Sequence, residues 1–288
     1  MTRATTTPSR PRSPQIRTLR TPGTASPPPA PASLRVPPGE RRYAWLSQRP
    51  LHVLVFLLPL VIAYEVGGAI WLFGPAGGGE NIRAHEHLAR LLGAFGATGV
   101  FLPGALLVVV LLVWHALSRD PWRVKPSVLG RMLVESALWT LPLLVLGAMA
   151  QRVAQESLAA AAVQGGGAAG VSAVPAGAKL TLALGAGLYE ELLFRLFGIA
   201  ALHFALVDVL RMKHRPGLWV AAAISAVAFA LYHDASFFAG GGLGGLDAER
   251  FAFLSLAGMY LGAVFILRGF GIVVAAHALY DVVVFFAA

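Results

Sequence analysis

The sequence predicts an all-α fold: a polytopic transmembrane bundle of seven to eight helices with an intramembrane polar cavity, preceded by a disordered N-terminal tail. Three observations predict it. The 288-residue chain is 57% hydrophobic and only 13% charged, a balance too apolar for a soluble domain with a solvated surface. Apolar runs of about 20 residues, long enough to cross roughly 30 Å of hydrocarbon, recur along most of the chain. Ionisable residues inside some of these runs predict the cavity, because charged groups within a membrane face the bundle interior.

Residues 1–45 are predicted to form the tail, and residues 46–288 the membrane-embedded domain. The tail is rich in Pro, Thr, Ser, Ala and Arg and shows no apolar periodicity, so it cannot bury a core. Residues 1–50 hold nine of the 23 Lys and Arg residues but only one of the 14 acidic residues, and the remainder of the chain is nearly neutral. An arginine-rich segment before a first span is a positive-inside signal, which predicts a cytoplasmic N-terminus and no nucleic-acid partner.

Seven apolar segments are predicted to cross the bilayer: 51–73, 97–117, 131–151, 178–210, 217–234, 251–268 and 271–287. The fourth is too long for one straight crossing, because 33 residues at about 1.5 Å each extend roughly 50 Å. It is either one broken helix or two helices. The basic connections 118–131 and 211–215 are both cytoplasmic if this segment crosses once, which favours a single net crossing with a bent or interfacial second half. Outer loops are then expected at 74–96 and 152–177.

Two short patterns in the connecting segments resemble known binding motifs but do not predict a binding site. Residues 240–245 fit the G-x-G-x-x-G spacing, but no strand precedes them, so a flexible loop is expected rather than a dinucleotide site. The run His85-Glu86-His87 lacks the H-E-x-x-H spacing of zinc proteases and is expected to be a solvated loop cluster. Three further ionisable residues have no motif partner and are expected to line the cavity or the interface: Glu65, His115 and His203.

The stretch Tyr189–Arg195 sets two adjacent carboxylates and a guanidinium inside an apolar run. One ionised group near the bilayer centre costs roughly 2.5–3.5 kcal/mol on insertion scales, so a cluster of charges must be compensated or used. On a helix at about 100° per residue, Glu191 lies about 40° from Arg195, whereas Glu190 lies about 140° from it. We therefore expect Glu191 and Arg195 to form a structural ion pair and Glu190 to face another group. A direct catalytic part for Glu191 is the alternative.

Further polar groups lie deep in two later apolar runs. His233 ends one of them, four residues after Phe229, which is interpreted as a packing residue. His277 and Asp281 occupy the last run and are four residues apart, so they share a helix face. Because buried polar groups in lipid face the bundle interior, we expect these side chains and Glu190 to share one cavity.

These residue types suit hydrolysis of an amide by an activated water. A carboxylate such as Glu190 can accept a proton from water, and a neutral imidazole can position that water or bind a metal that carries it. Side-chain donors on a third helix could stabilise the developing oxyanion. The chain has no cysteine, which excludes disulfides, thiolate metal ligands and a Cys nucleophile. No serine in the spans lies in a recognisable nucleophile motif.

Three motifs, in this order, resemble those of the CPBP family of intramembrane proteases, which includes the type II CAAX prenyl endopeptidases and bacterial proteins similar to the lysostaphin resistance protein. The family shows Glu-Glu-x-x-x-Arg, Phe-x-x-x-His and His-x-x-x-Asn or Asp. Here they are matched by Glu190, Glu191 and Arg195, by Phe229 and His233, and by His277 and Asp281. The resemblance covers about residues 130–288. It implies a helical bundle with a water-filled cavity in a bacterial inner (cell) membrane, and endopeptidase activity on a membrane-associated protein or peptide.

The resemblance also implies roles for individual residues. The implied catalytic residues are Glu190, Glu191, His233, His277 and Asp281. Zn²⁺ is the implied cofactor, with Glu190, His233 and His277 as its ligands, and a metal-free glutamate mechanism is the alternative. Asp281 stands where eukaryotic prenyl proteases have Asn. Because a carboxylate is a worse oxyanion donor than an amide, Asp281 is expected to orient His277 or to bind a metal.

Two other functions are consistent with these residues. A non-catalytic, bacteriocin-immunity-like or binding membrane protein could keep the fold and use the cavity for recognition. A proton-coupled transporter could use the Glu, His and Asp residues as a proton relay. The sequence shows no inverted repeat and no pair of Gly/Pro-broken spans in corresponding halves, which argues against the transporter.

Overall fold

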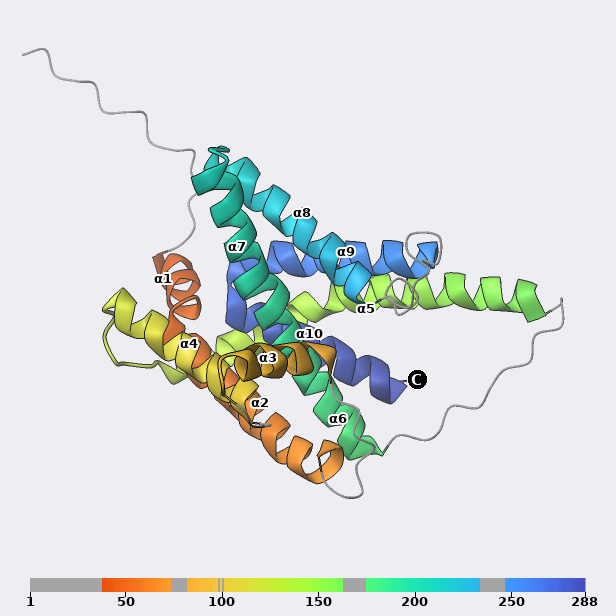
Figure 1. Cartoon of the computed structure of the whole chain (residues 1–288), viewed down its shortest axis with the longest axis horizontal. Helices are drawn as coiled ribbons and strands as arrows, with labels where there is room; N and C mark the ends of the chain where they lie inside the picture. The colour runs from red at the N-terminus through yellow and green to blue at the C-terminus, as the bar shows by residue number, and fades with distance from the viewer. Residues whose placement is uncertain are drawn as a thin grey trace, which may run out of the picture. The chain divides into compact units, whose positions relative to one another are not determined.

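The computed structural model describes residues 38–73, 82–97, 99, 101–162, 175–233 and 247–287, and every regular element in these ranges is a helix. The all-α prediction is therefore confirmed. The first 37 residues of the predicted tail and the glycine-rich segment 240–245 lie outside the described residues. The α-helices, labelled in Figure 1, are α1 (Pro38–Ser47), α2 (Pro50–Gly67), α3 (Arg83–Ala94), α4 (Leu102–Ser118), α5 (Pro126–Ala162), α6 (Ala176–Gly185), α7 (Ala200–His203), α8 (His214–His233), α9 (Ala248–Arg268) and α10 (Phe270–Ala287).

Six helical segments of the described chain are long and apolar enough to cross a membrane: Pro50–Leu72, Pro126–Arg152, Ala176–Val209, His214–His233, Ala248–Arg268 and Phe270–Ala287. Each coincides with one of the predicted spans. The remaining prediction, 97–117, corresponds to α4, which is apolar but shorter. The protein is thus an integral, multi-pass membrane protein. Its first crossing continues beyond α2 through a π-helical turn, η2 (Gly68–Leu72).

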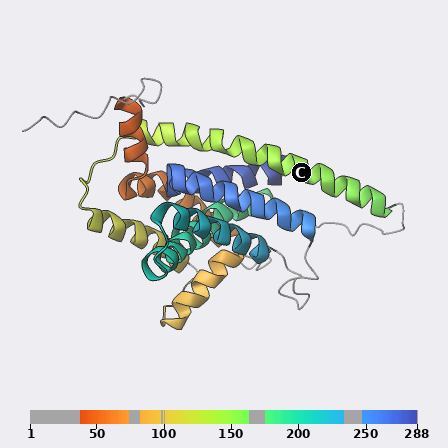
Figure 2. The same cartoon turned by 90° about the horizontal axis from the view of Figure 1, so that it is seen from above.

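Helix α5 is longer than the predicted span 131–151. It begins at Pro126 and continues to Ala162, so the predicted outer loop 152–177 is partly helical. The prediction ended where the sequence becomes polar, but Gln, Arg, Glu and Ala are good helix formers and the helix continues past the apolar stretch. Figure 2 shows α5 running alongside α9 and α10, which both pack against it.

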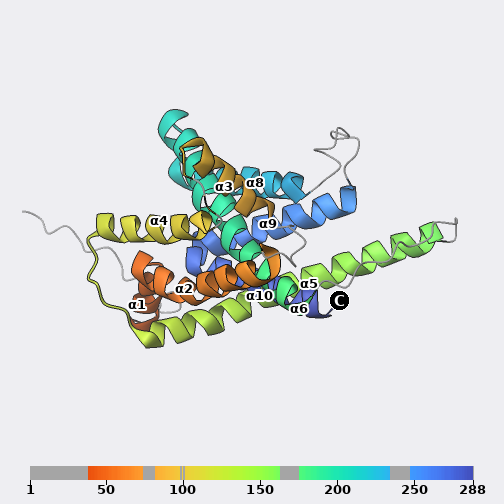
Figure 3. The ribbon, with the colours of Figure 1, turned by 60° about the horizontal axis from the view of Figure 1, so that its bottom comes forward.

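The segment Ala176–Val209 is one continuous helix, and neither the predicted break nor a second helix is present. Three of its stretches are π-helical: η3 (Ala186–Glu190), η4 (Leu192–Ile199) and η5 (Phe204–Val209). The residues at the junctions keep right-handed helical backbone angles, so the axis continues, as Figure 3 shows. A π-turn bonds residue i to i+5 and advances less per residue than an α-turn, which shortens a long segment without breaking it.

Residues 38–45 were assigned to the tail from the sequence, but they form most of α1, and the predicted boundary is wrong by this helix. Tyr43 of α1 is buried, and its hydroxyl donates a hydrogen bond to Glu135 of α5. Glu135 also forms an ion pair with Arg268 at the end of α9. Burial and the bond to Glu135 raise the pKa of the Tyr43 phenol well above its usual range, so the hydroxyl remains a donor. These contacts join three helices at one point.

The segment that contains His85 was expected to be a solvated loop, but it forms helix α3. The His85 side chain is buried, and its ring packs against Tyr64, Phe73 and Tyr189. Figure 3 shows α3 beside the long helix, where it contacts η3. One face of α3 is apolar and the other is charged, so the helix packs against its neighbours through the apolar face. It is too short and too polar to be a membrane span.

Candidate active site

Four of the five predicted catalytic residues line one cavity of about 470 Å³. Glu190 is the last residue of η3, and His233 is the last residue of α8. His277 and Asp281 are one turn apart on α10. Apolar side chains of α5, α6 and α9 complete the lining. The structure therefore brings together side chains that are separated by up to 91 positions in the sequence.

A glycine sets the distance between the two helices that carry Glu190 and His277. A Cβ atom at Gly187 would lie 2.7 Å from the Ala278 Cβ atom and 2.8 Å from the Val274 carbonyl oxygen. Only glycine therefore allows the backbone of η3 to approach α10 this closely. Because Gly187 is three residues before Glu190, this approach directly determines how near the carboxylate comes to the α10 side chains.

Glu190 presents its carboxylate to the cavity. Its Oε2 atom lies 3.4 Å from Nε2 of His233 and 4.0 Å from Nε2 of His277. Its side chain is almost entirely buried, with a residue exposure of 6%, and it reaches open space only through the cavity. Glu190 is thus the acidic residue of the Glu190–Glu191 pair that a molecule in the cavity can contact.

Glu191 is fully buried, with 0% exposure, and does not line the cavity. Its Oε1 atom lies 2.9 Å from Nη1 of Arg195 and accepts a hydrogen bond from Nδ1 of His277 at 2.7 Å. Since an ionised carboxylate can only accept, Nδ1 of His277 carries the hydrogen and Nε2 is directed toward the cavity. Arg195 also donates to the Gly258 carbonyl at 3.2 Å and lies over the ring of Phe229.

His233 is held by the backbone of its own helix. Its Nδ1 atom lies 2.8 Å from the carbonyl oxygen of Phe229, which can only accept, so Nδ1 carries the hydrogen and Nε2 faces Glu190. Phe229 therefore has more than a packing role, because its carbonyl sets the His233 tautomer and its ring lies beneath Arg195. Three acceptor atoms, one from Glu190 and one from each histidine, converge on one region, an arrangement suited to a water that donates both hydrogens.

Asp281 extends this group from the next turn of α10, with Oδ2 lying 3.6 Å from Nε2 of His277. Zn²⁺ bound by Glu190, His233 and His277 stays a prediction. Zinc requires donors about 2.0–2.2 Å from one point, and no group of three or more His, Asp or Glu side chains in the described part of the chain is placed to hold a metal. We therefore derive no step through a metal ion.

Glu65, His115 and His203 were expected at the cavity or at the interface, and none of them lies at the cavity. Glu65 accepts a hydrogen bond from the Tyr189 hydroxyl at 3.1 Å. His115 is buried in α4, and His203 lies 3.0 Å from His214 on an exposed surface. None of the three lines the cavity, so of the two predicted places only the interface remains.

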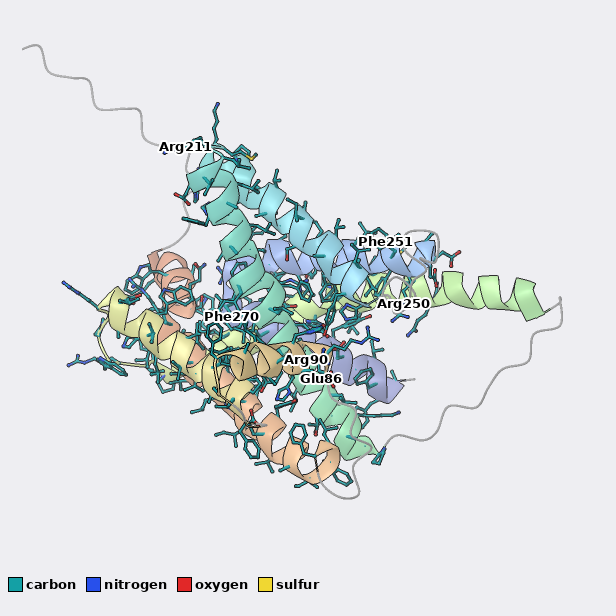
Figure 4. The ribbon with its side chains drawn as sticks, in the orientation of Figure 1. Glu86, Arg90, Arg211, Arg250, Phe251 and Phe270 are labelled. Carbon is teal, nitrogen blue, oxygen red and sulfur yellow. The ribbon has the colours of Figure 1, made fainter. Side chains whose placement is uncertain are left out.

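Sequence reasoning missed four polar residues that line the cavity: Arg83, Tyr232, Arg250 and Tyr280. Nη1 of Arg83 donates a hydrogen bond to the Tyr232 carbonyl at 3.2 Å, which ties α3 to the end of α8. Tyr232 and Tyr280 each directly precede a motif residue, and this position in the sequence could have indicated that they lie near the cavity. The two arginines lie at the starts of α3 and α9, where no motif marks them; Figure 4 labels Arg250.

Comparison with known proteins gives one match. The family model described as type II CAAX prenyl endopeptidase Rce1-like matches residues 173–283, which include all three motifs. No curated protein and no solved structure matches the chain. The resemblance inferred from the motifs is confirmed over residues 173–283, which are similar to the type II CAAX prenyl endopeptidase Rce1-like family.

Proposed function

We propose that this protein is an intramembrane endopeptidase that hydrolyses a peptide bond of a membrane-associated protein or peptide. One observation carries the proposal: the Glu190 carboxylate and the Nε2 atoms of His233 and His277 converge on a cavity enclosed by membrane-spanning helices. The match to a protease family over residues 173–283 supports the reaction class. We place the protein in a bacterial inner membrane, with its N-terminus in the cytoplasm.

In the proposed reaction, Glu190 is the general base. It takes a proton from a water molecule held between its carboxylate and the two Nε2 atoms. The water oxygen then bonds to the substrate carbonyl carbon, and the carbonyl oxygen becomes an oxyanion. When the C–N bond breaks, the proton held by Glu190 passes to the leaving amine. Each atom of water is thereby accounted for in the new carboxylate and the new amine.

The other site residues have supporting roles in this proposal. Glu191 fixes the His277 ring through Nδ1, and Arg195 neutralises Glu191. Because Nδ1 of each histidine already carries a hydrogen, a ring can donate to the oxyanion from Nε2 only after Nε2 also takes up a proton, here from solvent, and Asp281 as a carboxylate cannot donate. Asp281 lies 3.6 Å from Nε2 of His277 and orients that ring toward the substrate.

The test uses purified, detergent-solubilised protein with a library of apolar peptides, followed by mass spectrometry of the products. Wild-type protein is expected to generate defined cleavage products and Glu190→Gln protein none. Equal cleavage by both proteins would contradict the proposal. A non-catalytic binding protein would retain peptides without cleaving them, and a proton-coupled transporter would acidify liposomes without cleaving them.

A second arm of this experiment addresses the metal. Because no group of three or more His, Asp or Glu side chains in the described part of the chain is placed to hold a metal, we expect chelator-treated protein to keep its turnover and elemental analysis to find no stoichiometric transition metal. Loss of activity on chelation, with recovery on adding Zn²⁺, would show that the three ligands move together in the working enzyme and that the metal-free mechanism is wrong.

A further inference from the structure

The cavity has two cationic side chains in its lining that the proposed reaction does not use. Arg83 is the first residue of α3, and Arg250 lies in the first turn of α9. Both line the same cavity as Glu190 and Asp281. The cavity lining therefore includes two arginines as well as the Glu190 carboxylate that would activate water.

Neither arginine is explained by the stability of its own helix. The first turn of a helix carries a partial positive charge, so a cation there is disfavoured. The N-cap of α9 is Asp247, whose carboxylate accepts from the backbone N–H groups of Glu249 and Arg250 at 3.1 and 3.2 Å. That cap stabilises the helix start through backbone atoms and makes no use of the Arg250 guanidinium.

Both guanidinium groups also have unused hydrogen-bonding capacity. Within the part of the chain that the structure describes, the Arg250 side chain forms no ion pair or hydrogen bond. Arg83 forms no ion pair there and donates one hydrogen bond, to the Tyr232 carbonyl. Since a guanidinium carries five N–H donors, most donors of both residues are available to a bound molecule. By contrast, Arg90 of α3 forms an ion pair with Glu86 at 3.3 Å, and neither residue lines the cavity; Figure 4 labels both.

We propose that Arg83 and Arg250 are specificity-determining residues that together bind a carboxylate of the substrate peptide close to its scissile bond. The bond from Arg83 to the Tyr232 carbonyl ties one guanidinium to the residue that precedes His233. Both arginine residues are exposed to solvent, and arginine forks bind carboxylates with two parallel hydrogen bonds. The carboxylate could be the chain terminus of the substrate or an acidic side chain. This inference rests on the proposed endopeptidase function.

The test compares matched peptides in detergent micelles. One apolar peptide that the wild-type protein cleaves is made as a C-terminal acid, as a C-terminal amide, and as an amide with one Glu near the cleavage site. We expect wild type to show a KM about 10-fold lower for a carboxylate form than for the plain amide, with similar kcat. Arg83→Gln and Arg250→Gln should each raise that KM about 10-fold and leave the plain amide unchanged. Preference for the acid form alone identifies the chain terminus, and preference for the Glu form identifies a side chain.

Two controls separate recognition from damage to the fold. Arg90→Gln, on the exposed face of α3, should behave as wild type with all three peptides. Arg83→Lys and Arg250→Lys keep the charge and should retain part of the carboxylate preference. The proposal is overturned if wild type shows the same KM for all three forms, or if the Gln variants slow cleavage of the plain amide as much as that of the carboxylate forms. It is also overturned if anionic phospholipid, and not peptide charge, changes KM in an Arg83- and Arg250-dependent way.

A binding experiment distinguishes failure of this proposal from failure of the endopeptidase function. The dissociation constant of a heptapeptide of Ala, Val and Leu, in acid and amide forms, is measured with Glu190→Gln protein and with the same protein carrying Arg83→Gln and Arg250→Gln. A preference for the acid form that depends on the arginines supports carboxylate recognition even if no peptide is cleaved. No preference in any variant overturns it, even if cleavage is robust.

Discussion

Glu190 and Glu191 are adjacent in the sequence, but their surroundings assign them different tasks. Glu190 borders the cavity, whereas Glu191 is enclosed behind it with Arg195 and His277. Glu190→Gln preserves volume and removes the proton acceptor, so we expect turnover to fall by roughly 10²–10⁴-fold. Thermal unfolding in detergent should change little. The measurements are kcat with a library peptide and the melting temperature of the same preparation.

Glu191→Gln should have the opposite profile, because it leaves Arg195 as an unpaired buried cation. Loss of one partner of a buried pair costs about 3–5 kcal/mol, so low expression and a lower melting temperature are expected. Adding Arg195→Leu should restore part of the stability, since both charges are then gone. Turnover should stay low in this double variant because a neutral amide oxygen replaces the carboxylate that accepts from Nδ1 of His277, which weakens the bond that fixes this ring. A Glu191→Gln protein that melted like wild type, combined with a fully active Glu190→Gln protein, would reverse the two assignments.

At the scale of elements, the approach of η3 to α10 depends on Gly187. Gly187→Ala would place its Cβ atom 2.8 Å from backbone atoms of α10, which cannot rotate away as a side chain can. We expect α10 to be displaced, with a loss of about 1–3 kcal/mol of stability and of most of the turnover. Gly130→Ala in α5 is the matched control, because nothing lies within 4 Å of its added Cβ atom. It should be neutral or stabilising. Equal behaviour of the two variants in melting and turnover would show that this close approach is unimportant.

The spans and the motif residues could be predicted because long apolar runs and charges within them are strong signals. The elements that were missed have weaker signals. Helices α1 and α3 have 10 and 12 residues and are partly polar, so neither resembles a span. The π-turns around Glu190 follow from packing against other helices, which hydropathy does not report. The link from Glu191 to His277 joins positions 86 apart and could not be seen without the fold.

At the scale of the whole molecule, the charge distribution predicts orientation. The basic connections at 118–131 and 211–215 and the arginine-rich N-terminal segment favour the cytoplasm. The connection between α5 and α6 is then on the opposite side. A reporter fused near Gly165 should therefore be non-cytoplasmic by protease protection or by a compartment-specific enzyme assay. Cytoplasmic accessibility of that fusion would invert the topology.

A deletion that ends before α1 should have a different effect from a deletion that also removes α1. Deleting residues 1–37 leaves Tyr43 and its bond to Glu135 in place, so turnover of the inserted protein should equal that of wild type. Deleting residues 1–47 removes that bond and exposes the contact of Glu135 with Arg268. This longer truncation should melt at a lower temperature. Lost turnover in the shorter, correctly inserted truncation would show that the tail contributes to the site.

The four-residue spacing of Glu191 and Arg195 has a consequence for how the protein is made. This pair can form as soon as its own segment is helical, which reduces the cost of roughly 2.5–3.5 kcal/mol that each unpaired charge adds to membrane insertion. The partners of Glu190 lie on α8 and α10, which the ribosome produces later. We expect a chain that ends at Gly269 to insert but to hydrolyse nothing. Synthesis thus completes the neutralising pair first and the reactive group last, so the proposed protease is expected to stay inactive until its final helix has entered the membrane.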